Sequence, residues 1–380
     1  MVRGRVREHG NRWSIVVYAP LDGRAKRCYR WHWGFETKDD AQRALTELLH
    51  SLQTDSHVEP SEDTVATYLR QWLEGERVQL RRSTWSSYRM NLERHIIPRL
   101  GGTPLRDLTA AALNALYADL LEEGRVDGRG GLSFRSVRYI HTILHKALAD
   151  AVREDRVDRN VADQARPPRG RSGSGMRTWS AEELRAFLEH VRDDRLYAAW
   201  LLAASTGMRR GEVLGLHWRD VDLGAKRVAV TQSLVAVQGD LLFLPPKTDR
   251  ARRNIALDDV TAAALKARRM TQIRERLEWG RAYLDNDLVF NYEEGSPLHP
   301  DWFTKQFKAH VHATGLPPIR LHDLRHTHAT LALAAGVHPK VVQERLGHSS
   351  ISVTLDTYSH AIPALQEEAA AKVSRLLFGD

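Results

Sequence analysis

Two polar stretches divide this chain and limit what it can fold into. Asp55–Asp63 is short and polar, and Ala165–Arg177 (ARPPRGRSGSGMR) is rich in proline, glycine, serine and arginine. A sequence of the second kind buries too little apolar surface to fold and behaves as a flexible, basic linker. The chain of 380 residues is also long enough for two or three domains. We therefore expect a multidomain protein whose domains span residues 1–54, 64–165 and 176–380.

The first segment predicts a small β-sheet with one helix. Arg12–Tyr18 is rich in strand-forming residues, and Lys26–Trp33 alternates polar with bulky side chains. Thr37 is a candidate N-cap for a helix that follows. The apolar face of that helix would comprise Ala41, Leu45, Leu48 and Leu52. The first thirty residues carry eight basic side chains and two acidic ones. Such a sheet suits DNA, although a solvated basic surface explains the charge as well.

The middle segment predicts helices alone. Apolar residues recur at helical spacing from Val65 to Leu73, and a second helix opens at Ser83 and stops at Pro98 and the glycines after it. Thr109 caps a third helix, and a fourth runs through Val137–Ala151. Nothing in this segment indicates catalysis.

The last segment is also mainly helical. Ser180 and Glu183 form a capping box before the first helix, and a second helix crosses an apolar run near Trp200. Three short strands are expected, over Val228–Val237, Leu241–Leu244 and Asn254–Leu257. Helices then resume from Asp258. The expected fold is thus multidomain and mainly α, with a small sheet and helix first, a helical domain second, and a mainly helical domain with a small antiparallel sheet last.

Composition excludes several classes of protein. A single cysteine, Cys28, excludes an intramolecular disulfide framework and a cysteine-based zinc finger. The basic start has no apolar stretch behind it, so we expect no secretory signal. The apolar run Leu196–Ala204 is far shorter than the roughly 20 residues that cross a bilayer. We expect an intracellular protein. The net charge of +8 favours a nucleic-acid partner only weakly.

Two places in the last segment offer cations for an anionic ligand. In TGMRRGE, a Thr-Gly break places Arg209 at the start of a helix, where backbone N–H groups favour anions. Glu212 follows one turn later and can hold an arginine in place. Lys247 lies in a turn between two strands. Taken singly, a surface ion pair and a surface lysine explain these residues.

Histidines and a tyrosine follow. His322 and Arg325 share one helical face, as two donors to a single phosphate require. His322 and His326 also have the i, i+4 spacing of metal ligands, but no glutamate follows His322 and no cysteine lies near. A structural pair of histidines is a further reading. His348 and Tyr358 complete the set.

Together these residues converge on metal-free cleavage of a phosphodiester by a tyrosine. Fixed cations and hydrogen-bond donors stabilise the more highly charged transition state more than the ground state. A tyrosine nucleophile stores the energy of the broken bond in a phosphotyrosine ester. A lysine can protonate the leaving 5′-oxygen. We therefore expect no metal and no cofactor.

The sequence at this point resembles the tyrosine recombinases, the phage integrase family. The resemblance lies in TGMRRGE with a downstream LHW, in LHDLRHTHAT and in LGHSSISVTLDTYSH. It implies a catalytic set of Arg209, Lys247, His322, Arg325, His348 and Tyr358, in which Tyr358 is the nucleophile and the others activate the phosphate. Glu212 fits the acidic partner of the first arginine. Two prolines precede Lys247, which makes its match the least secure.

The resemblance extends over the whole chain. Residues 64–165 are similar to the helical core-binding domain, and residues 1–54 to the three-stranded arm-binding module of phage and mobile-element integrases. Asn160-Val161 departs from the usual Asn-Pro at the end of the core-binding domain. The family implies double-stranded DNA attachment sites, a homotetramer in the synaptic complex, accessory bending or directionality proteins, and action in the bacterial cytoplasm at the nucleoid.

The resemblance implies a site-specific recombinase that integrates or excises a mobile element through a 3′-phosphotyrosine. Three alternatives stay open. One is a DNA-binding regulator that has lost catalysis, and another is a topoisomerase of the type IB kind. A metal-dependent transposase or nuclease would need clustered carboxylates.

Overall fold

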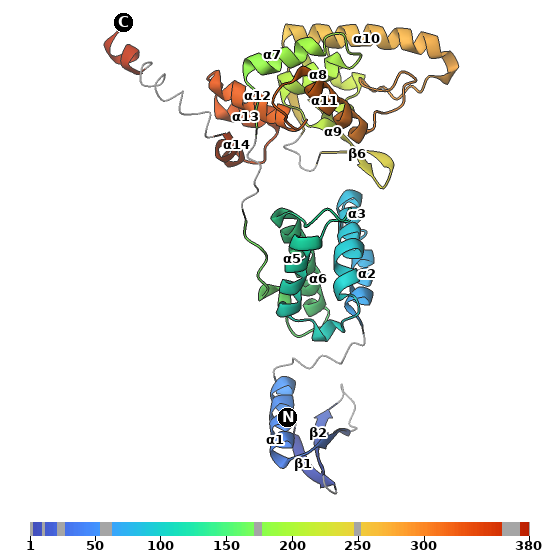
Figure 1. Ribbon diagram of the computed structural model, residues 1–380, viewed down its shortest axis with the longest axis vertical. Coiled ribbons are helices and arrows are strands. Elements are labelled where there is room, and N and C mark those ends of the chain that lie inside the picture. Colours follow the sequence, from blue (N-terminus) through green and yellow to red (C-terminus); the bar gives the residue numbers. More distant parts are fainter. Residues whose placement is uncertain are drawn as a thin grey trace. The chain divides into compact units, whose positions relative to one another are not determined.

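The computed structural model describes residues 3–9, 12–20, 27–53, 63–170, 177–246, 252–358 and 373–379. The chain separates into two compact units, residues 1–173 and 174–380, and each is described by itself (Figure 1). The mainly helical, multidomain fold expected from the sequence is confirmed. Within the described residues, no helix combines the length and the apolar character that a membrane span requires.

The N-terminal part of the first unit is an antiparallel sheet that packs on one helix. Its elements are β1 (Arg3–His9), β2 (Arg12–Pro20), β3 (Arg27–Phe35) and α1 (Lys38–Gln53), with the strands in the order β1-β2-β3. Ile15 of the sheet and Ala41 and Leu45 of α1 form a small core. The Asp40 amide donates to Thr37 Oγ1 at 3.1 Å, which confirms the predicted cap.

The rest of the first unit is helical. Its elements are α2 (Val65–Gly75), α3 (Arg82–Asn91), η1 (Leu92–Ile96), α4 (Ile97–Leu100), η2 (Leu105–Asp107), α5 (Ala110–Glu123), α6 (Phe134–Arg153) and η3 (Val161–Asp163). The Tyr68 hydroxyl donates to the Ala147 carbonyl at 2.7 Å, and Trp72 Nε1 donates to Asp150 at 2.8 Å. These bonds join α2 to α6 inside the core, where buried polar groups need partners.

The second helix of this region differs in detail from the prediction. It begins at Arg82 and continues past Pro98 to Leu100 as α3, η1 and α4. The π-helical turn η1 widens the hydrogen-bond spacing, so that Ile97 N donates to Leu92 O. Pro98 then lies at the start of α4, where a missing N–H costs little.

The second unit is mainly helical, with two small sheets. Its elements are α7 (Ala181–His190), α8 (Tyr197–Thr206), α9 (Arg210–Leu214), η4 (Trp218–Asp220), β4 (Val221–Asp222), β5 (Arg227–Val230), β6 (Ser233–Val237), β7 (Asp240–Leu244), β8 (Arg253–Ala256), α10 (Asp259–Trp279), η6 (Gly280–Ala282), α11 (Pro300–Thr314), α12 (Asp323–Ala334), α13 (Pro339–Leu346) and α14 (Ile351–Tyr358). The capping box of Ser180 and Glu183 is confirmed at α7. Trp200 of α8 stacks on Phe303 of α11 with ring centroids 4.0 Å apart, at the centre of the main core.

The strands of this unit correct the sequence prediction. The run expected as one strand over Val228–Val237 is two strands, β5 and β6, which belong to different sheets. β5 pairs with β4 and β8, whereas β6 forms a hairpin with β7. Between them, the side chains of Thr231 and Gln232 bond to Asp220 and to the Gly215 carbonyl. Those bonds replace strand pairing at the break.

A separate small core lies at the C-terminal end of the described second unit. It consists of Ala329 and Leu333 of α12, Val342 and Leu346 of α13, and Tyr358 of α14. α13 also contacts β8, so these helices join the three-stranded sheet. Lys247 lies outside the described residues, as do Leu365 and Ala369 of the region after Asp258 that was expected to be helical.

Candidate active site

Arg209 is held at a helix start by a single carboxylate. α8 ends at Gly207, whose φ of +66° reverses the chain, and Arg209 is the N-cap of α9. Glu212 accepts hydrogen bonds from the Arg209 amide at 2.9 Å and from Arg209 Nη1 at 2.8 Å. Arg209 Nη2 donates to the Gly347 carbonyl at 3.3 Å. The expected pairing of Arg209 with Glu212 is present, and it places the guanidinium beside the loop that carries His348.

Arg253 is a second arginine on the same carboxylate. Its Nη2 and Nη1 donate to the two Glu212 oxygens at 2.8 and 3.1 Å, and its Nε donates to the Arg345 carbonyl at 2.7 Å. Burial alone would raise the pKa of Glu212, but the hydrogen bond from Arg253 and the charges of Arg253 and Arg209 hold that pKa below its usual value. Glu212 therefore stays ionised and orders both arginines.

Arg325 is the most deeply buried cation of the group. It lies on α12 with 3% of its surface exposed, and Nη1 donates to the Gly207 carbonyl at 2.8 Å. Its Nη2 is buried and has no hydrogen-bond partner within the part of the chain that the structure describes. Burial and the charge of Arg209 lower the pKa of Arg325 to about 9. An anion placed here would supply both the missing acceptor and the missing charge.

Two histidines flank these arginines. His322 is the N-cap of α12, and part of its surface is exposed. Burial of the rest of the ring and the charge of Arg325 lower the pKa of His322. His348 follows Gly347, and its Nδ1 lies 2.8 Å from Thr354 Oγ1. Burial and the charge of Arg325 lower the pKa of His348 to about 4. Both rings are therefore neutral near pH 7, so each can donate a hydrogen bond without carrying charge.

Tyr358 ends α14 and is fully buried. Its ring lies parallel to that of His348, with centroids 6.4 Å apart and an angle of 9°. Its hydroxyl oxygen lies 2.7 Å from His326 Nδ1. Burial raises the pKa of Tyr358 to about 12, with the charge of Arg325 acting against it.

The structure thus brings together five of the six predicted site residues, Arg209, His322, Arg325, His348 and Tyr358, while Lys247 lies outside the described residues. Sequence reasoning missed Arg253 as a ligand of Glu212 and His326 as the partner of Tyr358. Alternate side chains of a strand point to the same face, so Arg253 shares a face of β8 with the buried Ile255. This spacing was a signal that the Arg253 side chain points inward. The sequence spacing relates His326 to His322 alone. Their rings do approach, edge to face at 5.1 Å, but no group of three or more metal-binding side chains occurs among the described residues.

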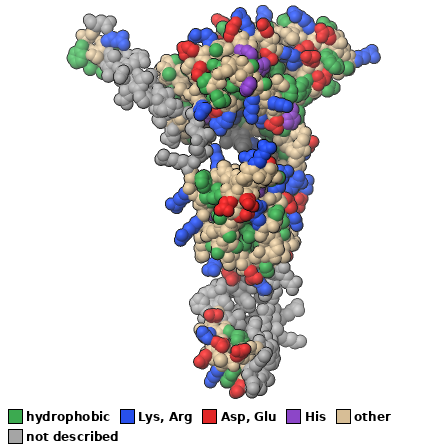
Figure 2. All heavy atoms as spheres, viewed as in Figure 1, with side chains coloured by type: hydrophobic (Ala, Val, Ile, Leu, Met, Phe, Trp, Pro, Cys, Tyr) green, Lys and Arg blue, Asp and Glu red, His purple; other side chains and the backbone are tan. Residues whose placement is uncertain are grey.

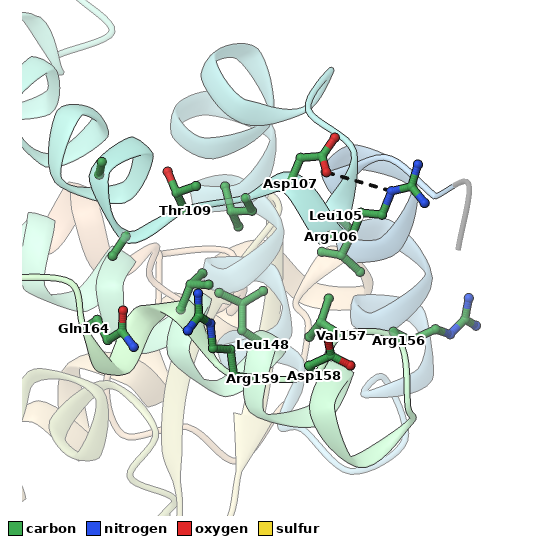
Figure 3. Close-up of a pocket in the computed structure, with 14 residues that line it drawn as sticks. Leu105, Arg106, Asp107, Thr109, Leu148, Arg156, Val157, Asp158, Arg159 and Gln164 are labelled. Carbon is green, nitrogen blue, oxygen red and sulfur yellow. Dashed lines mark ion pairs between the residues drawn. The ribbon is translucent and has the colours of Figure 1, made fainter. Parts of the chain in front are cut away.

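The first unit contains a cavity of about 720 Å³ whose lining residues are not those of the candidate active site. It lies between η2, the start of α5 and the segment after α6, and none of the six predicted residues lines it (Figure 3). Its arginines Arg106 and Arg156 pair with Asp107 and Asp63. A third arginine, Arg159, also lines the cavity, whereas the buried Nη2 atom of Arg325 lies on α12.

Comparison with known proteins agrees with this geometry. The model of the phage integrase family matches residues 177–364, and the model of the N-terminal SAM-like domain of phage integrases matches residues 64–121. The ICEBs1 integrase of Bacillus subtilis is 33% identical over 252 residues, which is 65% of this chain and 67% of the relative. The chain belongs to the phage integrase family.

Further relatives of this integrase-family chain cover nearly all of it. A tyrosine recombinase XerC-like protein of Caldanaerobacter subterraneus is 27% identical over 96% of both chains. Among solved structures, the Tn1549 transposon integrase in complex with a circular intermediate DNA superposes with a TM-score of 0.66 at 21% identity, covering 81% of this chain and 99% of that one. A lambda integrase dimer bound to a core site gives a TM-score of 0.59 at 17% identity, covering 93% and 94%. At these identities the structural likeness shows the shared fold.

Proposed function

We propose that this protein is a site-specific DNA recombinase that cleaves and rejoins DNA through a 3′-phosphotyrosine and so integrates or excises a mobile element. The relatives are named integrases and a tyrosine recombinase. DNA is a polyanion whose scissile phosphate needs fixed cations, and the site supplies several. The reaction takes place in the bacterial cytoplasm, where the DNA lies.

The observation that carries this proposal is the unpaired donor of Arg325. A buried guanidinium nitrogen without an acceptor costs about 1–3 kcal/mol or more. A non-bridging phosphate oxygen at Nη2 removes that cost and neutralises charge shared with Arg209. Both arginines are pre-oriented by backbone carbonyls and Glu212, so they stabilise the developing charge with little reorganisation.

Each remaining residue has a part in the transesterification. The Tyr358 oxygen attacks phosphorus and displaces the 5′-oxygen, which takes a proton from Lys247. His322 and His348 donate hydrogen bonds to the phosphate oxygens. Because Tyr358 has no exposed surface in the free chain, the groups that cover its oxygen must move aside before DNA reaches it.

The rest of the chain positions DNA and partners. We assign residues 1–54 to arm-type sites, 64–165 to the core site and 176–380 to catalysis. Basic and acidic side chains are interspersed over the visible face of the described protein (Figure 2). A solved relative is a lambda integrase tetramer bound to a Holliday junction. We assign the same tetrameric assembly to this protein, together with accessory DNA-bending or directionality proteins. We also propose that Val373 and Leu376, which are 54% and 86% exposed, dock on a neighbouring protomer. Intact synapsis after deletion of residues 363–380 would refute that docking.

The test is covalent capture on a nicked suicide DNA duplex. The duplex carries the end sequences of the mobile element that encodes the protein. Wild-type protein should form a protein–DNA adduct in the presence of EDTA. Tyr358→Phe should bind but form no adduct, whereas Tyr197→Phe, a half-buried tyrosine of the same unit, should behave as wild type. Binding by the wild type without an adduct would identify a silent regulator. Relaxation of supercoils without strand exchange would identify a topoisomerase.

A further inference from the structure

Tyr358 is bonded to a histidine that lies outside the six-residue catalytic set. His326 Nδ1 is 2.7 Å from the Tyr358 hydroxyl oxygen, and the two ring centroids are 5.7 Å apart. The distance is that of a strong O–H···N hydrogen bond. His326 lies on α12, one residue after Arg325, so the helix that supplies the buried arginine also supplies this contact.

The protonation states of the pair fix the direction of the bond. Burial lowers the pKa of His326 to about 4, assisted by the nearby His322 and opposed by Asp323. Burial raises the pKa of Tyr358 to about 12. At neutral pH the pair is therefore a phenol and a neutral imidazole. The phenol donates its proton to Nδ1, and the other ring nitrogen carries the imidazole proton.

Two other bases of the candidate site are committed to other partners in the described structure. His348 Nδ1 bonds to Thr354, and its ring stacks parallel to that of Tyr358. The Glu212 oxygens receive bonds from Arg209 and Arg253. His326 is the base whose lone pair already lies on the proton that must leave when Tyr358 attacks.

We propose that His326 accepts the hydroxyl proton of Tyr358 during cleavage and returns it when the DNA is resealed. In cleavage the Oη–H bond breaks and the proton moves to Nδ1, while an Oη–P bond forms. The P–O5′ bond breaks, and that oxygen takes its proton from Lys247. Resealing reverses each transfer, so no proton is gained or lost overall. The proposal rests on the proposed function, because it concerns the same tyrosine.

The imidazolium formed in this step lies among several ionisable groups. Asp323, on the same helix, favours it, and so does the negative charge gathering on the phosphate. The groups that face His326 are His322, Asp323 and Arg325 on its own helix, Arg320 before the helix, and His348 and Tyr358 from the segment packed against it.

Two substitutions separate proton transfer from positioning. His326→Asn keeps an acceptor oxygen near the place of Nδ1 but cannot take up a proton, and His326→Ala removes both functions. If His326 is the base, the single-turnover adduct rate of both variants falls by about 10²- to 10⁴-fold, the range of general base catalysis. The rate of each variant then rises about tenfold per pH unit, since hydroxide replaces the base. Added imidazole rescues His326→Ala. The exposed His312→Asn on α11 serves as the matched control and keeps the wild-type rate.

The leaving group gives an independent check. A substrate with a 5′-bridging phosphorothiolate restores cleavage to Lys247→Ala, because a thiolate leaves without a proton, but it does not restore His326→Ala. A wild-type rate and pH profile in His326→Asn would overturn the proposal, as would rescue of His326→Ala by the phosphorothiolate. ¹⁵N spectra of the full-length chain test the contact without DNA: Tyr358→Phe should shift the Nδ1 resonance of His326, and an unchanged resonance also counts against the proposal. If the wild type forms no adduct, the proposed function fails and this proposal falls with it.

Discussion

Removing the Arg253 guanidinium should destabilise the second unit strongly. The side chains of Arg253 and Glu212 are each 6% exposed and share two hydrogen bonds. Loss of one partner from a buried pair costs about 3–5 kcal/mol, because the other charge stays buried. Arg209, which is 40% exposed, still faces Glu212 and compensates in part. We therefore expect Arg253→Ala to lower the free energy of unfolding by about 3 kcal/mol.

The control is an equally well-formed but exposed pair. Arg70 and Glu93 also share two hydrogen bonds, both at 2.8 Å, with side chains 55% and 43% exposed. Water screens such a pair, so Arg70→Ala should cause little measurable change. Geometry is matched in this comparison, and burial is the variable.

Hydrogen–deuterium exchange in a urea titration of the full-length chain measures the loss of stability caused by Arg253→Ala and by Arg70→Ala. Peptides from α8 and α9 report the second unit, and peptides from α2 and α3 report the first. In a double-mutant cycle, Glu212→Gln should remove most of the effect of Arg253→Ala, because no buried charge is then left unpaired. Equal effects of Arg253→Ala and Arg70→Ala, or additive effects in the cycle, would refute the reasoning.

Two further predictions concern pH and one glycine. His326, His328 and His348 have pKa values of about 4 when folded, below the ordinary 6.5, so the unfolded chain binds more protons. Stability of the second unit should be complete above about pH 6.5 and fall as pH drops toward 4, and a flat urea midpoint over that window would contradict this. Gly207→Ala should destabilise the second unit and weaken DNA cleavage, because φ is +66° and a Cβ would lie 2.6 Å from Leu346 Cδ2 and 2.9 Å from the His328 ring. Gly128→Ala, at a φ of +68° with open space, should show only the backbone penalty of about 1 kcal/mol in thermal unfolding.

Local patterns predicted local structure well. Caps such as Thr109 and Ser180 were readable because donor and acceptor lie within one turn. The helix start at Arg209 followed from the Thr-Gly break before it, which the αL conformation of Gly207 explains. The break in the 228–237 run was not readable, because each half is a good strand and only its pairing with other strands separates them.

The candidate site was predictable by family pattern rather than by physics. Arg209 and Glu212 lie three residues apart in the sequence, so their hydrogen bond was expected from the helical spacing. The contact between His326 and Tyr358 joins residues 32 positions apart and has no local signature. The i, i+4 spacing instead suggested that His326 pairs with His322, one helical turn away. Tertiary packing decides which histidine meets the tyrosine.

The bonds that orient the site close very long loops of chain. Arg209 to Gly347 spans 138 residues, Arg325 to Gly207 spans 118, and Arg253 to Arg345 spans 92. Closing such loops costs chain entropy before these contacts can form. A nascent or proteolysed chain therefore presents arginines and a tyrosine with no fixed geometry among them. The arrangement of the site is therefore complete only after residues 345–358 have been made and packed against the earlier part of the second unit.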